Sequence, residues 1–200
     1  MKTQKLFIGL GSVAAILVIY FGWSLLKTAD YKGEILSARE EKAIWMSTSL
    51  ESPFNEQQVV FEGLNYFDPD PSFNITADFQ KNQAQEELTL IANDGETRQY
   101  TIYGTAVFTI SNVPCSLLVL SSESELGTKM FIPFMDETSG QETYGAGRYL
   151  EAALPLVDKI QLDFNEAYNP YCAYMDGYTC PFPPKANKLS VAVLAGEKVY

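Results

Sequence analysis

The pattern of apolar and polar positions divides the chain into three parts, and the first is strongly apolar. Leu6–Leu26 contains 21 residues without a charged side chain, LFIGLGSVAAILVIYFGWSLL. A helix of this length spans roughly 30 Å, which is the thickness of the hydrocarbon core of a bilayer. Tyr20, Phe21 and Trp23 lie near its end, where aromatic residues commonly meet the membrane interface. The segment predicts a single transmembrane helix, with the membrane as a partner through residues 6–26.

A cleaved signal peptide is the main alternative for this segment, and a buried helix of a soluble protein is the other. Signal peptides usually have an apolar core of about 7–15 residues before a small-residue cleavage site. The run here is longer, and Leu25–Ala29 offers no such site, so an uncleaved signal anchor is favoured. Lys2 and Lys5 favour a cytoplasmic N-terminus. We therefore expect a single-pass protein of the cell membrane with an extracytoplasmic C-terminal domain, periplasmic if the cell is Gram-negative.

The second part has the pattern of an amphipathic helix. After a short polar connector, Ala29–Gly33, the segment Glu34–Leu50 follows. Its apolar stripe consists of a seven-residue repeat, Leu36, Ala43 and Leu50, widened by Ile35, Ala38, Ile44 and Met46. Arg39 and Lys42 are expected on or near the polar side of this helix. It should pack on the sheet that follows.

From Val59 onward, short extended runs alternate with turn residues. The candidate strands are Phe73–Gln80, Glu87–Ala92, Arg98–Tyr103, Thr105–Ser111, Ser116–Ser121, Lys129–Phe134, Tyr144–Leu150, Lys159–Phe164 and Lys188–Leu194. Asn93-Asp94-Gly95 predicts a hairpin, because glycine readily takes the positive φ that such turns need. The pattern predicts a mainly β, β-rich α+β fold, an antiparallel barrel or sandwich with one N-terminal packing helix. Residues 1–28 would be the anchor and 29–200 a single domain.

Composition excludes several classes of function. The formal net charge is −11, and three of the 14 basic residues precede Thr28 while all 25 acidic residues follow it. Such an acidic domain repels nucleic acid. The chain has no histidine, which excludes Ser-His-Asp catalysis, histidine bases and histidine-ligated zinc. Phosphate-binding glycine motifs are also absent. Any catalysis must use carboxylates, tyrosines, cysteine or lysine, and no cofactor is expected.

Glu142–Pro184 is the least generic stretch, because it combines tyrosines, prolines, cysteines and a scarce arginine. The planar guanidinium of Arg148 can bind a carboxylate through two hydrogen bonds. This carboxylate would belong either to a ligand or to Asp136, Glu142 or Asp163. The predicted ligand-binding residues are Tyr144, Arg148, Tyr149, Asp163, Asn165, Tyr168, Asn169 and Tyr171. Four tyrosines could line a pocket, or they could equally cover the end of a barrel with their hydroxyls outward, namely Tyr168, Tyr171, Tyr174 and Tyr178.

Carboxylate and amide oxygens in this stretch have two further interpretations. Asp163, Asn165 and Asn169 could cap the backbone of their own loop, or they could bind calcium together with Asp136 and Glu142. Their spacing does not resemble an EF-hand, so no metal site is predicted.

Cys172 and Cys180 are eight positions apart. Outside the cytoplasm the default expectation is a disulfide, which would stabilise a loop of this size by about 2–3 kcal/mol. Free or metal-bound thiols are the alternatives, but a zinc site would need two more ligands. Cys115 opens an apolar run and is expected to be a buried free thiol.

Five longer segments resemble a known family. They are FEGLNYFDPDPSF at Phe61–Phe73, IPFMDETSGQETYGAGRYL at Ile132–Leu150, LDFNEAYNPYCAY at Leu162–Tyr174, CPFPPKANKL at Cys180–Leu189 and AGEK at Ala195–Lys198. These segments are similar to the bacterial domain of unknown function 1684, and the resemblance extends from about Glu34 to Lys198. The chain looks like the short, membrane-anchored form of Bacteroidetes-type relatives. The resemblance implies which residues to test and implies no activity.

Three classes of function follow from these observations. The first is a module that binds a small polar ligand or an envelope protein. The second is a hydrolase that uses Asp136, Glu142 or Asp163 as acid and base, which requires carboxylates with separated pKa values at a working distance from each other. The third is a purely structural envelope protein. The sequence leaves open whether the chain is an enzyme.

Overall fold

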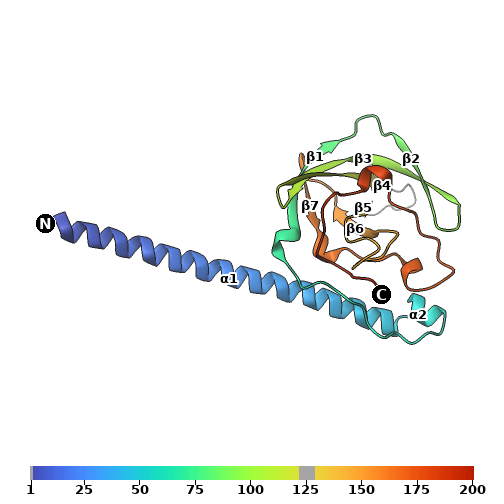
Figure 1. The fold of residues 1–200 in the computed structure, drawn as a ribbon, viewed down its shortest axis with the longest axis horizontal. Helices are drawn as coiled ribbons and strands as arrows, with labels where there is room; N and C mark the ends of the chain where they lie inside the picture. The colour runs from blue at the N-terminus through green and yellow to red at the C-terminus, as the bar shows by residue number, and fades with distance from the viewer. Residues whose placement is uncertain (1, 122–128) are drawn as a thin grey trace.

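The computed structural model describes the backbone of residues 2–121 and 129–200, and the side chains of residues 22, 26–121 and 130–200. One long helix leads into a β domain (Figure 1). The helices are α1 (Lys2–Thr48) and α2 (Pro53–Glu56), with short 3-10 turns at Pro71–Phe73, Phe164–Glu166, Tyr171–Ala173 and Lys185–Asn187. The strands are β1 (Asn74–Lys81), β2 (Glu87–Ile91), β3 (Thr97–Ile110), β4 (Val113–Ser121), β5 (Lys129–Phe134), β6 (Arg148–Ala153) and β7 (Lys159–Asp163).

The strands form one antiparallel sheet in the order β6-β5-β4-β3-β1-β7, and β2 pairs with β3 beside β1. The two end strands, β6 and β7, also contact each other, so the sheet curls into a nearly closed barrel (Figure 1). Closing the sheet in this way leaves little exposed edge. The prediction of a mainly β antiparallel fold with one N-terminal helix is therefore confirmed in its barrel form.

Four predicted elements differ from the structure, and one of them is the strand expected at Tyr144–Leu150, which lies instead at Arg148–Ala153. Arg98–Tyr103 and Thr105–Ser111 belong to one strand, β3, whose pairing with β4 shifts between Ile102 and Gly104. A Cβ atom at Gly104 would lie only 2.3 Å from the Phe79 ring, so glycine permits the close approach at this bulge. Lys188–Leu194 forms a bridge to Met135 but no strand.

The connector Ala29–Gly33 is also different, because α1 continues through it without interruption. No proline breaks the helix there, and a single glycine is tolerated in a helix interior. The docked face of α1 differs as well. Leu36 and Leu50 are exposed, whereas Ile35 and Met46 are buried.

Polar residues of α1 face the β domain alongside this narrow apolar stripe. Arg39 Nη1 donates to the carbonyl oxygen of Phe67 at 2.8 Å, and Lys42 Nζ lies 2.7 Å from Glu197 Oε1. The predicted apolar stripe is therefore confirmed at Ile35 and Met46 but not at Leu36, and the polar contacts of Arg39 and Lys42 add to the interface.

Apolar side chains from β1 and from β3 to β7 fill the interior of the barrel. The main buried cluster includes Phe79, Ala106, Leu117, Ile132, Phe134, Leu150, Leu162 and Phe164, together with Val193 and Ala195 of the C-terminal segment. The C-terminal segment thus belongs to the core. The same segment also forms one wall of an open groove.

No helix within the part of the chain whose side chains are described is long and apolar enough to cross a membrane. The predicted anchor, Leu6–Leu26, lies mostly outside that part. Its transmembrane role stays a prediction.

Candidate functional site

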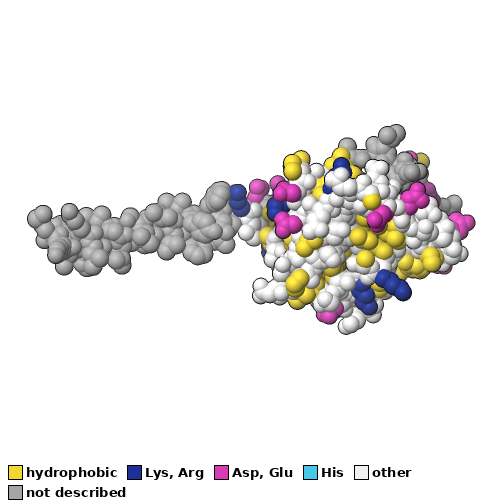
Figure 2. Space-filling model, turned by 90° about the horizontal axis from the view of Figure 1, so that it is seen from above, with side chains coloured by type: hydrophobic (Ala, Val, Ile, Leu, Met, Phe, Trp, Pro, Cys, Tyr) yellow, Lys and Arg dark blue, Asp and Glu magenta, His cyan; other side chains and the backbone are white. Residues whose placement is uncertain are grey.

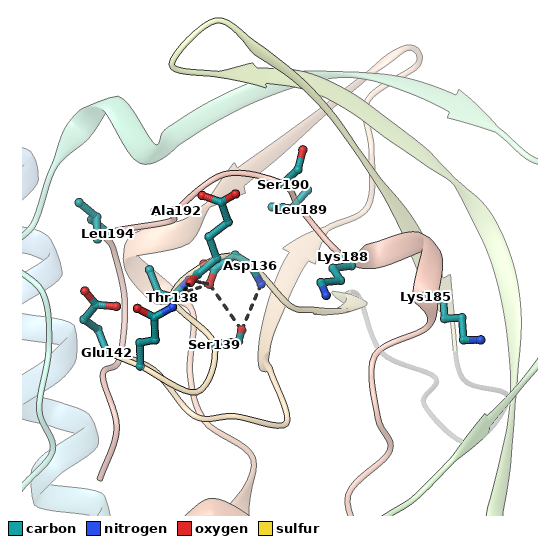
Figure 3. Close-up of a pocket in the computed structure, with 12 residues that line it drawn as sticks. Asp136, Thr138, Ser139, Glu142, Lys185, Lys188, Leu189, Ser190, Ala192 and Leu194 are labelled. Carbon is teal, nitrogen blue, oxygen red and sulfur yellow. Dashed lines mark hydrogen bonds between the residues drawn. The ribbon is translucent and has the colours of Figure 1, made fainter.

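An open groove of about 900 Å³ lies at one end of the barrel (Figure 3). Its walls are the loop between β5 and β6 and the C-terminal segment from Lys185 to Leu194. The lining residues are Asp136, Glu137, Thr138, Ser139, Gln141, Glu142, Lys185, Lys188, Leu189, Ser190, Ala192 and Leu194. Its volume is in the range of small-molecule sites, although it is more open and more polar than most.

A buried ion pair fixes the two walls of the groove to each other. Arg148 Nη2 donates to Asp136 Oδ2 at 2.8 Å, and the two side chains are 1% and 0% exposed. The backbone N–H of Val193, in the opposite wall, donates to the same oxygen at 3.2 Å. Asp136 Oδ1 accepts hydrogen bonds from the N–H and the hydroxyl of Thr138, at 2.9 and 2.5 Å. The Asp136 carboxylate thus joins β6, its own loop and the C-terminal segment.

Arg148 also holds the C-terminal segment directly. Its guanidinium donates to the carbonyl oxygens of Val193 at 3.0 Å, of Glu197 at 3.1 Å and of Ala195. Burial lowers the pKa of Arg148, and the charge of Asp136 opposes that change. The guanidinium stays charged, because arginine does not lose its proton in proteins. In this structure Arg148 thus joins β6 to the β5–β6 loop and to the C-terminal segment.

The glycine before Arg148 is required by the same packing. Gly147 has a φ of +95°, and a Cβ atom there would lie 2.6 Å from the carbonyl oxygen of Phe134. Glycine at position 147 thus allows a close approach of the backbone that a side chain would prevent.

Charged side chains that serve no internal ion pair line the groove itself. Glu137, Glu142, Lys185 and Lys188 are exposed, and none has an ion-pair partner among the described residues. Figure 3 shows Glu142 at one end of the groove, Lys185 at the other end and Lys188 between them. The groove therefore presents negative charge at one end and positive charge at the other.

Four of the predicted ligand-binding residues are buried and engaged in internal hydrogen bonds. Besides Arg148, the Tyr149 hydroxyl donates to the carbonyl oxygen of Pro181 at 2.6 Å. Asn165 Nδ2 donates to the Asp70 carbonyl oxygen at 2.8 Å, and Asn169 Nδ2 donates to that of Lys198 at 2.8 Å. None of these side chains lines the large groove.

The remaining predicted tyrosines do not converge on one concavity either. The Tyr144 hydroxyl lies 4.0 Å from Cys172 Sγ, and burial raises the pKa of Tyr144 to about 12. Tyr168 donates to Glu151 Oε1 at 3.1 Å, while the Tyr171 ring packs edge-on against Tyr178. These contacts do not gather the predicted tyrosines around one pocket of the described residues.

The three candidate acid–base carboxylates have separate environments. Asp136 is buried against Arg148 and backbone amides. Both oxygens of Asp163 accept the Tyr31 hydroxyl at 2.8 Å, and Oδ1 also accepts the Asn165 N–H at 3.0 Å. Glu142 is exposed in the groove. Two of the three are therefore committed to holding backbone and side chains in place, and this geometry argues against a paired-carboxylate hydrolase.

Glu197 is a buried carboxylate that sequence reasoning did not single out. It is 1% exposed. Lys42 and the Tyr66 hydroxyl contact Oε1 at 2.7 and 3.3 Å, while the Tyr174 hydroxyl and the Asn169 N–H donate to Oε2, the latter at 2.9 Å. Glu197 belongs to the AGEK segment that resembles the family, and the preceding residue, Gly196, has a φ of +77° beside the carbonyl oxygen of Ala167.

A second, smaller cavity of about 160 Å³ separates α1 from the domain beside Glu197. It is lined by Ile35, Ala38, Arg39, Lys42, Tyr66, Asn165, Glu166 and Glu197. Arg39 Nε is buried there without a hydrogen-bond partner, and burial lowers the pKa of Arg39. The cavity is too small for most ligands but has room for water.

The two cysteines of the predicted disulfide are free thiols in this structure. They lie next to each other, since the Cys172 N–H donates to Cys180 Sγ at 3.3 Å. The hydrogen bond from the Cys172 thiol lowers the pKa of Cys180 to about 7, and it raises that of Cys172. The disulfide expected from the sequence is thus not formed here. Cys115 is a buried free thiol, as predicted.

The fold and the groove together define a class, a β-barrel domain with an N-terminal helix and an open, mixed-charge groove. A family model described as "Protein of unknown function (DUF1684)" matches residues 59–198. The chain therefore belongs to this family, as the resemblance predicted. The Bacteroidetes-type, membrane-anchored form stays a prediction.

A solved structure is similar over most of the chain. It is the solution NMR structure of an uncharacterized protein of Haloarcula marismortui, which is 35% identical, with a TM-score of 0.66 over 86% of this chain and 96% of that chain. The comparison with curated proteins found no match. Neither the family nor the archaeal protein has an assigned activity in its description.

Proposed function

We propose that this protein is a ligand-binding module, held at the membrane by residues 6–26, whose groove takes a small zwitterionic ligand. The observation that carries the proposal is the buried Asp136–Arg148 pair, which fixes both walls of a groove whose own charges have no internal ion-pair partner among the described residues. A groove with walls fixed before binding loses little conformational entropy when a ligand enters.

The arrangement of charges favours the zwitterion. A cationic group of the ligand would lie near Glu142, and an anionic group would lie near Lys188 and Lys185 (Figure 3). Hydroxyls of Ser139 and Ser190 add hydrogen-bonding groups between them. Short peptides and amino acids have this pattern of charge, and an extracytoplasmic site would meet them in the envelope.

The test uses the full chain in lipid nanodiscs and two matched probes. Dialanine carries both charges, and dialanine with an acetylated N-terminus and an amidated C-terminus carries neither. Calorimetric titration should detect dialanine and not its blocked form. In Lys185→Ala/Lys188→Ala the affinity should fall about tenfold, which corresponds to the loss of two exposed ion pairs.

Lys159→Ala is the matched control, because Lys159 is an exposed lysine outside the groove that pairs with Asp78. Its affinity for dialanine should equal that of the unmodified protein. Equal binding of the blocked probe, or an equal loss of affinity in the control, would contradict a zwitterion site.

An envelope protein is the second candidate occupant of the groove, and its openness favours this candidate. A peptide segment of a partner would use the same charges. If neither dipeptide binds, crosslinking from a photoreactive residue at 190 in intact cells should capture a partner protein. If that capture also fails, the structural role becomes the better account.

We also propose that Cys172 and Cys180 close into a disulfide in an oxidising envelope. The two thiols would lose two protons and two electrons to an oxidising disulfide, which would be reduced to two thiols. The existing hydrogen bond between Cys172 and Cys180 supports this step. Mass spectrometry after treatment with glutathione disulfide should show a loss of two hydrogens in the unmodified protein and a mixed disulfide in Cys180→Ser.

A further inference from the structure

The turn between β6 and β7 has an exposed apolar tip, formed by residues 154–157. Leu154 is 46% exposed, Leu156 82% and Val157 94%. Exposed turns usually carry glycine, proline, asparagine, aspartate or serine, whereas this one reads Leu-Pro-Leu-Val. None of its side chains belongs to either apolar cluster of the described residues. Packing within the domain therefore does not explain why the tip is apolar.

The backbone at Val157 adds a second, independent observation. Val157 has a φ of +55°, in the left-handed region that is unfavourable for β-branched residues. The other described non-glycine residues with positive φ are polar, namely Gln58, Gln85, Ser111 and Asn112. Glycine or asparagine would relieve the strain at position 157. An apolar side chain in a strained and almost fully exposed position indicates that it contacts something other than its own domain.

The tip lies on the flank of the domain from which the anchor segment extends. β7 leads from the tip to Asp163, whose carboxylate accepts the Tyr31 hydroxyl. Tyr31 follows Leu26 by five residues, or about 8 Å of helix, and β7 is about 13 Å long. Figure 1 shows β7 on the side toward which the N-terminal half of α1 leaves the domain. Hydrophobic side chains protrude at this edge in Figure 2.

We propose that residues 154–157 insert into the boundary between headgroups and acyl chains of the bilayer that holds residues 6–26. The inference rests on the membrane attachment proposed above. The tip and the anchor would then fix the tilt of the barrel and the direction in which its groove faces. The contact is hydrophobic, because the acidic domain repels anionic lipid and the nearby Lys159 is paired with Asp78.

A fluorescent label tests this placement in the full chain. Leu156→Cys, labelled with an environment-sensitive nitrobenzoxadiazole group, is reconstituted into phosphatidylcholine vesicles. The control is Ala84→Cys, in the exposed turn between β1 and β2, and labelled unmodified protein gives the background from native thiols. The label at 156 should show a severalfold rise and a blue shift of emission, with protection from iodide, at both low and high salt. The label at 84 should show neither.

Flotation separates the two proposals. If the protein does not float with the vesicles, the membrane attachment fails and the tip proposal fails with it. If the protein floats but the label at 156 behaves like the label at 84, only the tip proposal is overturned. A blue shift in detergent micelles that grows with protein concentration would indicate that a second copy covers the tip, which also overturns it.

A second variant guards against an effect of misfolding. Val157→Asn in the labelled Leu156→Cys background should lower the emission rise in vesicles, while its unfolding temperature stays equal or increases because the left-handed backbone is relieved. An unchanged emission together with a lower unfolding temperature would show that Val157 serves the fold, and it would contradict the lipid contact.

Discussion

Two charged regions lie side by side at one end of the barrel, and they differ in what their charges contact. Arg148 and Asp136 are buried against each other and against the backbone of the β5–β6 loop and of the C-terminal segment. Glu142, Lys185 and Lys188 are exposed in the adjoining groove without ion-pair partners among the described residues. The chemically conspicuous arginine thus holds the walls of the groove together, whereas ordinary surface charges line the groove itself.

The largest effect is expected from the buried region. Arg148→Ala would leave the buried Asp136 carboxylate without its counter-charge and three backbone carbonyls without the guanidinium donor, so the free energy of unfolding should fall by about 3–5 kcal/mol. Urea denaturation measures this. Arg98→Ala, at an exposed arginine, should change it by no more than about 0.5 kcal/mol. Equal effects of the two substitutions would remove the distinction between the regions.

A smaller loss is expected at the contact between α1 and the domain. Glu197→Gln removes the charge that Lys42 pairs with and weakens the hydrogen bonds from Tyr66 and Tyr174, so unfolding should become easier by about 1–3 kcal/mol. Amide hydrogen exchange between residues 35 and 46 should become faster. Glu142→Gln in the groove is the control, and faster exchange there as well would show that Glu197 is not the specific docking contact.

Cys172 and Cys180, which belong to neither charged region, give a pH-dependent prediction. Cys180 has a folded-state pKa of about 7, below the ordinary thiol value, because of its hydrogen bond with Cys172. Its contribution to stability is therefore present above the ordinary thiol pKa and is lost as the pH falls through about 7.

Ultraviolet absorbance of the thiolate measures this titration in the reduced protein, since the pKa values of Cys115 and Cys172 are raised. The midpoint should lie near 7 and move up by about 1 pH unit in Cys172→Ala. An unchanged midpoint would mean that the neighbouring thiol does not stabilise the thiolate.

The smallest effect on stability is expected in the groove. Lys185→Ala/Lys188→Ala should leave the free energy of unfolding within about 0.5 kcal/mol of the unmodified value, because neither lysine holds another described charge. Thermal and urea denaturation measure this. A loss as large as that of Arg148→Ala would show that these lysines also belong to the fold.

The barrel could be predicted from the sequence because short-range patterns determine it. Alternating apolar residues and the turn at Gly95 placed β1, β2, β5 and β7 within a residue or two of their observed bounds. The bulge at Gly104 was not predictable in the same way, because it depends on the Phe79 ring from another strand. Two of the segments that resemble the family, Ile132–Leu150 and Cys180–Leu189, likewise contain residues of the ion pair and of the groove.

The groove could not be predicted, because its walls are distant in sequence and meet only through buried polar contacts. The pairing of Arg148 with Asp136 was among the alternatives, but no pattern indicates that Val193 completes it. Lys185 and Lys188 look like ordinary surface lysines until the C-terminal segment is placed beside the β5–β6 loop. Glu197 was missed for the same reason, because its partners Lys42 and Tyr174 come from opposite ends of the chain.

The most direct test of the central claim is a dialanine titration of the isotope-labelled full chain, followed by NMR chemical-shift changes. We predict that the largest changes occur at Glu142, Lys188 and Ser190 in the groove, and that they disappear in Lys185→Ala/Lys188→Ala. Changes centred on Tyr149, Tyr168 and Tyr171, with unchanged shifts for the groove residues, would contradict the claim. They would indicate that dialanine binds at these tyrosines.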